Sequence, residues 1–166
     1  MAGLKTPMAE LYVQPGESHL VTAPTMIRTL LGSCVGVTFR CARLGIAALC
    51  HPMLPTAPKA TSSGVQNPAP GPRFVDFAIL DLIRQFEARG ARRDEIEIKL
   101  FGGADVLIVN NPDESRPTVG KLNAEMAVKL LDREGLEVRA SCLGGDTGYF
   151  IHFNTETGEV LLRRLK

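Results

Sequence analysis

The stretch that decides the fold runs from Leu31 to Pro52 and reads LGSCVGVTFRCARLGIAALCHP. Two apolar runs flank a short polar connection, and this pattern predicts a β-hairpin. A four-residue loop over residues 41–44 is an allowed hairpin length. In the register that this loop sets, we expect Cys34 to lie directly opposite His51.

Side chains alternate between the two faces of a β-strand, so the predicted hairpin has a core face and a second face. The core face carries Val35, Val37, Phe39, Ile46, Ala48 and Cys50. The second face carries Cys34 and His51. Directly opposed residues have Cβ atoms about 4.5–5.5 Å apart. A thiol and an imidazole at that separation can share a proton. Because Pro52 has no N–H to extend the ladder, we expect His51 near the strand end, with an accessible side chain.

A Cys–His pair of this kind suits nucleophilic chemistry on a carboxamide. A free cysteine with a pKa of ~8.5 is only slightly ionised at neutral pH, but an adjacent imidazole can take the proton and favour the thiolate. Cys34 would attack the amide carbon, ammonia would leave with His51 as acid, and water would hydrolyse the thioester with His51 as base. The backbone N–H groups of Gly32 and Ser33 are the nearest candidate donors for the oxyanion.

Other interpretations of the histidines and cysteines stay open. Cys34 can be a core thiol, with His51 a strand-end histidine that is hydrogen-bonded to the backbone. A metal site of Cys34, Cys50 and His51 is disfavoured, because strand alternation turns Cys50 to the opposite face, so we expect no metal and no cofactor. His19 lies in a polar segment and His152 in the middle of a predicted strand, and both are weaker candidates for chemistry.

The rest of the chain predicts two helices and several strands. Apolar residues recur at helical spacing over residues 74–89 and 119–134, and a glycine follows each segment. Strands are expected over residues 96–100, 136–140, 149–154 and 160–164. With about seven strands in all, we expect an α+β fold, in which mixed and antiparallel sheets with β-hairpins pack against two main helices like an α/β sandwich.

The length and one loop segment describe the expected domain organisation. The 166 residues fit one domain, which we expect to span residues 1–166. Residues 55–72 are rich in Pro, Ser, Gly and Ala and predict a flexible loop. This loop begins four residues after His51 and could therefore form a wall of a site there.

Composition limits the partners and the compartment. Lys plus Arg number 19 and Asp plus Glu 18, which gives a formal net charge of +1, so we expect no nucleic-acid partner. The chain has neither a window long enough for a membrane span nor an apolar signal segment in its first ten residues, which favours the cytoplasm without membrane insertion. Its four cysteines have no C-x-x-C spacing and are expected to be free thiols.

The residues around the Cys–His pair resemble the CheD family of chemoreceptor glutamine deamidases. The similar runs are TLLGSCVGV over residues 29–37, CHPMLP over 50–55, FVD over 74–76, FGGA over 101–104, VG over 119–120 with Asn123, and GG over 144–145. Family members use a Cys, a His and a threonine upstream of the Cys, so the resemblance implies roles for Cys34, His51 and Thr29. The Thr29 hydroxyl could orient His51 by a hydrogen bond, or Thr29 can be an ordinary strand residue.

The resemblance implies an enzyme and two protein partners. The enzyme is a protein-glutamine glutaminase that hydrolyses glutamine side chains of methyl-accepting chemotaxis receptors to glutamate and ammonia. The partners are the cytoplasmic helices of the receptor, as substrate, and a CheC-type phosphatase of phosphorylated CheY. The chain departs from the family pattern at Leu122, Asp146 and Tyr149. These departures keep an alternative open, in which the chain is a weakly catalytic or non-catalytic binding partner of the CheC-type phosphatase.

Overall fold

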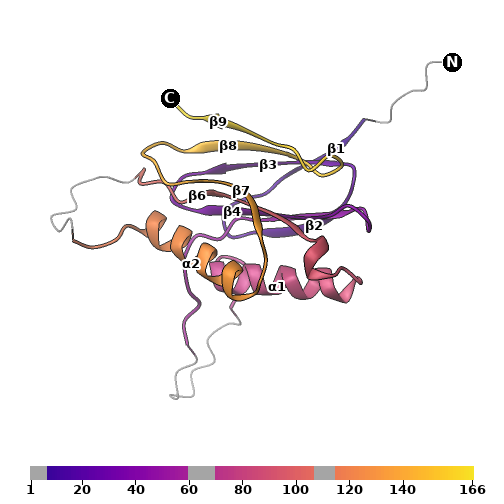
Figure 1. The fold of residues 1–166 in the computed structure, drawn as a ribbon. Helices are drawn as coiled ribbons and strands as arrows, with labels where there is room; N and C mark the ends of the chain where they lie inside the picture. The colour runs from indigo at the N-terminus through magenta and orange to yellow at the C-terminus, as the bar shows by residue number, and fades with distance from the viewer. Residues whose placement is uncertain (1–6, 60–69, 107–114) are drawn as a thin grey trace.

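The computed structural model describes residues 7–59, 70–106 and 115–166, and in this part of the chain two α-helices pack against a pair of stacked sheets (Figure 1). The elements are β1 (Ala9–Tyr12), β2 (Ser18–Thr22), β3 (Thr25–Leu31), β4 (Val35–Cys41), β5 (Ile46–Cys50), α1 (Val75–Ala88), the 3₁₀ turn η1 (Arg93–Glu95), β6 (Glu97–Gly102), α2 (Val119–Arg133), β7 (Val138–Leu143), β8 (Tyr149–Asn154) and β9 (Val160–Arg164). The α+β fold with two main helices is confirmed.

The sheets form two of the three layers of the molecule. One sheet has five strands in the order β2-β5-β4-β6-β7, and the other has four in the order β1-β3-β8-β9. Both sheets contain parallel and antiparallel pairs. Helices α1 and α2 cover one face of the five-stranded sheet, and the four-stranded sheet covers its other face (Figure 1).

Strand β4 lies in the middle of the five-stranded sheet and is buried on both faces. Val35, Val37 and Phe39 pack toward the helices, and the Phe39 ring lies 5.7 Å from that of Phe86 on α1. On neighbouring β5, Ala48 and Cys50 face the helices, whereas Ala47 and Leu49 pack against the four-stranded sheet. The predicted assignment of hairpin residues to two faces is therefore confirmed.

The hairpin register differs from the prediction by two residues. The turn occupies residues 42–45, and Cys41 pairs with Ile46, so Val37 lies opposite Cys50. Gly45 ends the turn with a φ of +61°, a conformation that glycine adopts without steric cost. Because the slip is two residues, every side chain keeps its face. Cys34 nevertheless lies before the start of β4 and is not directly opposite His51, so that expectation is wrong.

The helices and the C-terminal hairpin lie close to their predicted positions. Both helices are within one residue of the predicted segments, β8 and β9 have the predicted bounds, and β7 lies at Val138–Leu143 rather than at 136–140. The described residues contain nine strands instead of about seven. The described parts of the predicted loop, residues 55–59 and 70–72, contain no helix or strand, while residues 60–69 lie outside the described part.

Candidate functional site

Cys34 lies in a three-residue turn between β3 and β4 whose carbonyl groups are all held by hydrogen bonds. The Gly32 carbonyl accepts from the N–H of Ala104 at 3.0 Å, and the Cys34 carbonyl accepts from the N–H of Gly103 at 2.8 Å. The Ser33 carbonyl accepts from Nδ2 of Asn123 at 3.0 Å. These three bonds anchor the turn to β6 and α2, two elements far from it in the sequence.

The backbone N–H groups of the same turn are free. Among the described residues, none of the N–H groups of Gly32, Ser33 and Cys34 donates a hydrogen bond to another residue. In a trans peptide unit the C=O of one residue and the N–H of the next point in opposite directions, so holding the Gly32 and Ser33 carbonyls turns the N–H groups of Ser33 and Cys34 the other way. Donors held in this way are what an oxyanion site requires, and the role expected for Gly32 and Ser33 stays a prediction.

The close contact between this turn and the end of β6 explains Gly102, the first of the paired glycines. A Cβ atom on Gly102 would lie 2.3 Å from the Cys34 carbonyl oxygen, and the φ of Gly102 is +96°. Any residue with a side chain at position 102 would therefore push the turn away from β6.

His51 follows β5 and is enclosed by the N-terminal part of the chain. Its N–H donates to the Glu17 carbonyl at 2.9 Å, and its carbonyl accepts from the N–H of Gly16 at 2.8 Å. The side chain is 1% exposed. The expectation of an accessible His51 is therefore wrong, because β2 pairs along β5 and brings Gly16 and Glu17 over the strand end.

The His51 ring is oriented by Thr29. Oγ1 of Thr29, a fully buried residue of β3, lies 2.7 Å from Nδ1 of His51 and donates its proton to the Val13 carbonyl at 2.8 Å. A hydroxyl has one proton, so with that proton on the Val13 carbonyl, Thr29 can only accept from His51. Nδ1 therefore carries the imidazole proton, and Nε2 carries the lone pair.

The Nε2 atom of His51 is a buried base without a partner. It makes no hydrogen bond among the described residues. Burial lowers the pKa of His51 to about 4, while the Val13 carbonyl and the charge of Glu17 act in the opposite direction. At neutral pH the imidazole is thus neutral and able to accept a proton.

Cys34 is half-buried against Leu31, Phe101 and Ile151, between the two sheets. Burial raises the pKa of its thiol, although its own backbone N–H opposes this effect. The described residues show no hydrogen bond between the thiol and His51. The expected thiolate–imidazolium pair is therefore absent from this structure, where both groups are neutral at pH 7.

The two groups are nevertheless close neighbours in the fold. The N–H of Val35, next to Cys34, donates to the carbonyl of Pro52, next to His51, at 3.3 Å. Extending the register beyond its last pair, Val37 with Cys50, makes Cys34 and His51 diagonal neighbours, and residues in that relation have Cβ atoms roughly 7–8 Å apart or somewhat less. Of the other thiols, Cys41 and Cys50 pack on the helix side, where burial raises the pKa of Cys50 to about 12, whereas Cys142 packs against the same cluster as Cys34.

Asn123 is a site residue that the sequence did not assign. It is fully buried on α2, and its Nδ2 donates to the Ser33 carbonyl at 3.0 Å and to the Met53 carbonyl at 2.9 Å. The side chain thereby links the segment before Cys34 to the segment after His51. The available signal was a polar residue on the apolar stripe of a predicted helix, four residues before Ala127.

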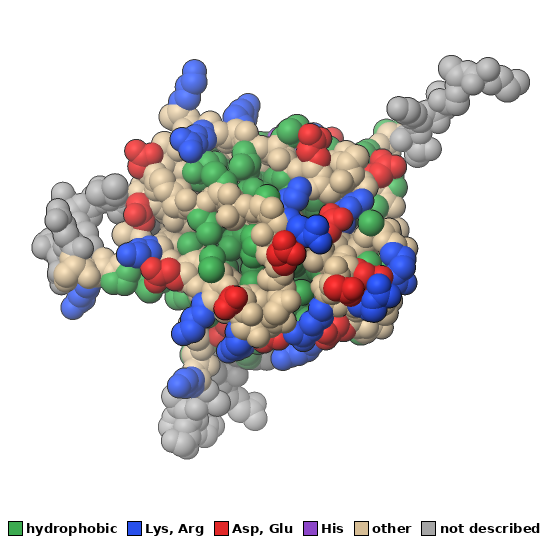
Figure 2. Space-filling model, viewed as in Figure 1, with side chains coloured by type: hydrophobic (Ala, Val, Ile, Leu, Met, Phe, Trp, Pro, Cys, Tyr) green, Lys and Arg blue, Asp and Glu red, His purple; other side chains and the backbone are tan. Residues whose placement is uncertain are grey.

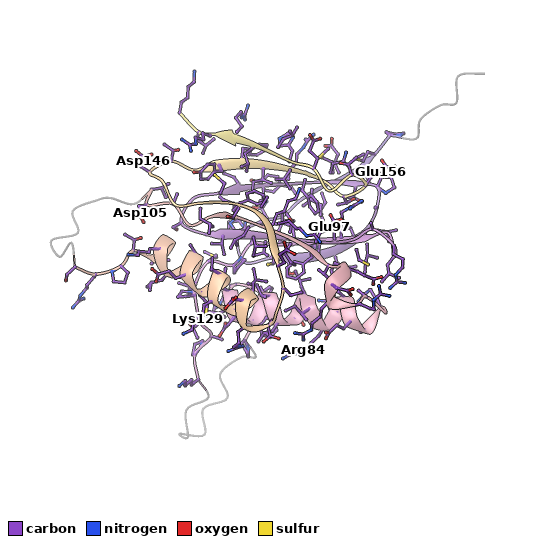
Figure 3. All side chains as sticks on the ribbon, viewed as in Figure 1. Arg84, Glu97, Asp105, Lys129, Asp146 and Glu156 are labelled. Atoms are coloured by element: carbon purple, nitrogen blue, oxygen red, sulfur yellow. The ribbon has the colours of Figure 1, made fainter. Side chains whose placement is uncertain are left out.

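Large exposed apolar side chains occur on the segments that build the site, namely after His51, after β6 and at the start of α2, and we term them the apolar rim. The rim consists of Met53, Leu54, Val106, Val119 and Leu122. Val106 contacts the site turn, since a Cβ on Gly32 would lie 3.1 Å from its Cγ2 atom. Figure 3 labels Asp105, next to Val106, and Asp146 at this end of the molecule, and Glu156 at the opposite end.

The family model described as "CheD chemotactic sensory transduction" matches residues 53–164, so the chain belongs to the CheD family. A Geobacter sulfurreducens protein named "Probable chemoreceptor glutamine deamidase CheD 2" is 40% identical over 158 residues, which are 95% of this chain and 91% of the relative. A protein from Nitratidesulfovibrio vulgaris named "Probable chemoreceptor glutamine deamidase CheD" is 37% identical. The alignment covers 96% of this chain and 79% of the relative. Another protein of that name, from Methanococcus maripaludis, is 36% identical, and the alignment covers 93% of this chain and 94% of the relative.

Among solved structures, the crystal structure of a Neisseria meningitidis protein of the family DUF152 aligns with a TM-score of 0.40 and 17% identity, over 78% of this chain and 52% of that chain. In the described part of the chain, no helix combines the length and the apolar character that crossing a bilayer requires.

Proposed function

We propose that this protein is a chemoreceptor glutamine deamidase that converts receptor glutamine side chains to glutamate and ammonia, with Cys34 as nucleophile and His51 as base. The observation that carries the proposal is the chain of hydrogen bonds from His51 through Thr29 to Val13, which leaves His51 Nε2 with a free lone pair next to the Cys34 turn. The names of the relatives support the substrate class.

The resting groups are neutral, so we propose general-base catalysis rather than a preformed ion pair. When the substrate amide enters, the thiol proton moves to His51 Nε2 as the sulfur bonds to the amide carbon. Apo structures often show such pairs too far apart, and the contact shortens in the substrate complex. The oxyanion then accepts hydrogen bonds from the free N–H groups of the turn, including those of Gly32 and Ser33.

The second half of the reaction returns the enzyme to its resting state. The C–N bond breaks as His51 gives its proton to the leaving nitrogen, and ammonia departs from a thioester on Cys34. Water attacks the thioester carbonyl with His51 again as base, and the C–S bond breaks. Glutamate leaves, and the thiol takes back its proton. No cofactor is needed for this sequence.

Replacing Thr29 with valine tests the orientation of His51. Valine has nearly the same shape but no hydroxyl, so Nδ1 of His51 loses its acceptor and Nε2 is no longer the fixed site of the lone pair. We expect kcat to fall about 10–100-fold, as for other residues that orient a reacting histidine. The measurement is ammonia release from a receptor cytoplasmic fragment. Thr29→Ser keeps the hydroxyl and serves as the control; equal rates for the two variants would contradict the role.

The apolar rim suits a helical protein substrate. Large exposed apolar residues gathered at one place mark interaction sites, and an amphipathic helix presents a matching apolar stripe. The cytoplasmic helices of a chemoreceptor are such segments, so we propose that they dock on the rim and present glutamine to Cys34. Leu122, which departs from the family pattern, belongs to this surface and would tune which receptor is accepted.

Leu122→Glu is expected to raise KM for the receptor fragment about tenfold with kcat nearly unchanged, because a charge replaces an apolar docking contact without touching the reacting atoms. Val128→Glu is a matched control on the same helix, since Val128 is 47% and Leu122 36% exposed and Val128 lies outside the rim. Steady-state kinetics of glutamate formation provides the measurement. A KM that rises equally in both variants, or in neither, would show that the rim does not bind substrate.

A second candidate function is supported by the absence of a hydrogen bond between Cys34 and His51 and by the same rim. In this proposal the chain is chiefly a regulatory partner of a CheC-type phosphatase, and the receptor helix and the phosphatase compete for the rim. Purified protein that binds such a phosphatase but releases no ammonia from a receptor fragment would favour this candidate over the enzyme.

The remaining partners follow from the surface and from the proposed substrate. On the face drawn in Figure 2, basic and acidic side chains are interspersed, so we propose no nucleic-acid partner. The proposed substrate is the cytoplasmic part of a receptor, so we place the protein in the cytoplasm, without membrane insertion.

A further inference from the structure

Three carbonyl groups of the Cys34 turn are held by three donors, and one of these donors is a side chain. Ala104 and Gly103 donate through their backbone N–H groups, whereas Asn123 donates through its amide. The amide orientation of Asn123 is determined by its surroundings, because its two partners, the carbonyls of Ser33 and Met53, can only accept. Asn123 can therefore be changed by mutation while the backbone donors stay in place.

The Ser33 carbonyl and the Cys34 N–H belong to the same peptide unit. No cis bond is found at this unit, so its C=O and N–H point in opposite directions. A carbonyl directed at Asn123 on α2 therefore directs the Cys34 N–H away from α2. If this peptide unit rotated, the carbonyl oxygen would take the place of the N–H and repel an oxyanion.

Asn123 has a feature that stability alone does not explain. Its Oδ1 atom is buried and has no hydrogen-bond partner among the described residues. A buried polar atom without a partner is costly and calls for an explanation. The same side chain holds the Ser33 carbonyl, next to Cys34, and the Met53 carbonyl, two residues after His51, and this links it to the candidate site.

On the basis of the proposed function, we infer that Asn123 is a positioning residue for the reaction. Through its bond to the Ser33 carbonyl, it fixes the Ser33–Cys34 peptide unit with the Cys34 N–H available to the oxyanion. Asn123 acts through these backbone groups and does not itself touch the substrate.

The test separates chemistry that forms an oxyanion from chemistry that does not. Deamidation passes through an oxyanion, whereas alkylation of Cys34 by iodoacetamide is a displacement at saturated carbon and needs only the thiolate. For Asn123→Ala we expect kcat to fall about 10–100-fold, with KM changed by less than about threefold and the alkylation rate of Cys34 changed by less than about twofold. A merely structural role would reduce deamidation and alkylation together.

Leu131→Ala is the control for lost stability, because Leu131 is fully buried on α2 and belongs to the helix-side core cluster, whereas Cys34 packs against a different cluster. It should lower the melting temperature without changing kcat. If Asn123→Ala does not unfold cooperatively, the Asn123→Gln variant is used in its place. Glutamine keeps an amide but displaces it by one methylene. We therefore again expect kcat to fall while the alkylation rate of Cys34 stays unchanged.

The outcomes distinguish the inference from the proposed function. A folded Asn123 variant with wild-type kcat, or with a parallel loss of alkylation, overturns the inference while the deamidase remains. Wild-type protein that is alkylated at Cys34 but releases no ammonia from the receptor fragment overturns the proposed function and the inference with it.

Discussion

Cys34→Ala is expected to reduce deamidation of a receptor cytoplasmic fragment by roughly 10⁴-fold or more, the scale seen when a catalytic nucleophile is removed. The sulfur forms the bond to the amide carbon in the proposed reaction, and alanine offers no replacement. Cys34 is half-buried, and the turn is held through backbone groups, so the fold should survive the change. The measurement is mass spectrometry of receptor peptides before and after incubation, which separates glutamate from glutamine.

Cys142→Ala is the matched control for this variant. Cys142 is the other half-buried thiol, and it packs against the same apolar cluster of Leu31, Phe101 and Ile151. Its loss should leave kcat unchanged. Full activity of Cys34→Ala, or a loss of activity that follows Cys142 instead, would show that Cys34 is not the nucleophile.

His51→Gln is expected to lower kcat by about 10²–10⁴-fold, the range for a lost general base. In the proposed reaction the neutral imidazole is the active form, and burial lowers the pKa of His51 to about 4. The rate should therefore persist below neutral pH and fall only as the pH approaches about 4. A pH profile of kcat/KM checks this, and an acid limb near the ordinary histidine value would contradict the burial of His51 in the active enzyme.

The same group links stability to pH. The pKa of His51 is about 4 when folded and 6.5 in its unperturbed state, so the unfolded chain binds the proton more tightly. The stabilisation is present above pH 6.5 and is lost as the pH falls toward about 4, a decrease of about 3 kcal/mol in the free energy of unfolding. Denaturant titrations at several pH values measure it.

His51→Gln should flatten this part of the stability profile, because glutamine does not titrate. His152→Gln is the control, since His152 lies on β8 and contacts the Phe150 ring, away from the Thr29 hydrogen bond. If the wild type and His51→Gln lose stability in parallel as the pH falls, another group is responsible.

The sequence predicted the parts of the fold that depend on local patterns. Apolar periodicity located α1 and α2 to within one residue, and strand alternation assigned Val35 and Cys50 to one core face, which in the structure is the face that the helices cover. The hairpin register was wrong by two residues, because the turn places Gly45 inside the loop rather than at the first pair. A pattern with a period of two does not detect a slip of two residues.

One contact of the candidate site was predictable from the sequence, but the surroundings of His51 were not. Thr29 was expected as a possible partner of His51, and the structure places its hydroxyl 2.7 Å from Nδ1. The burial of His51 was missed because Gly16 and Glu17 cover it through backbone bonds that any sequence could make. Asn123 was not assigned for a similar reason, since its partners are carbonyl groups of Ser33 and Met53, which carry no sequence signal.

The long sequence separations within the site set an order of events during synthesis. Cys34 and His51 both leave the ribosome early, yet Asn123, which holds the Ser33 carbonyl, is 90 residues further along than Ser33. A nascent chain therefore carries the thiol and the imidazole for some time before the side chain that supports the Cys34 turn exists. If Cys34 and His51 react as proposed, a chain whose synthesis has not passed α2 lacks that support and should be inactive.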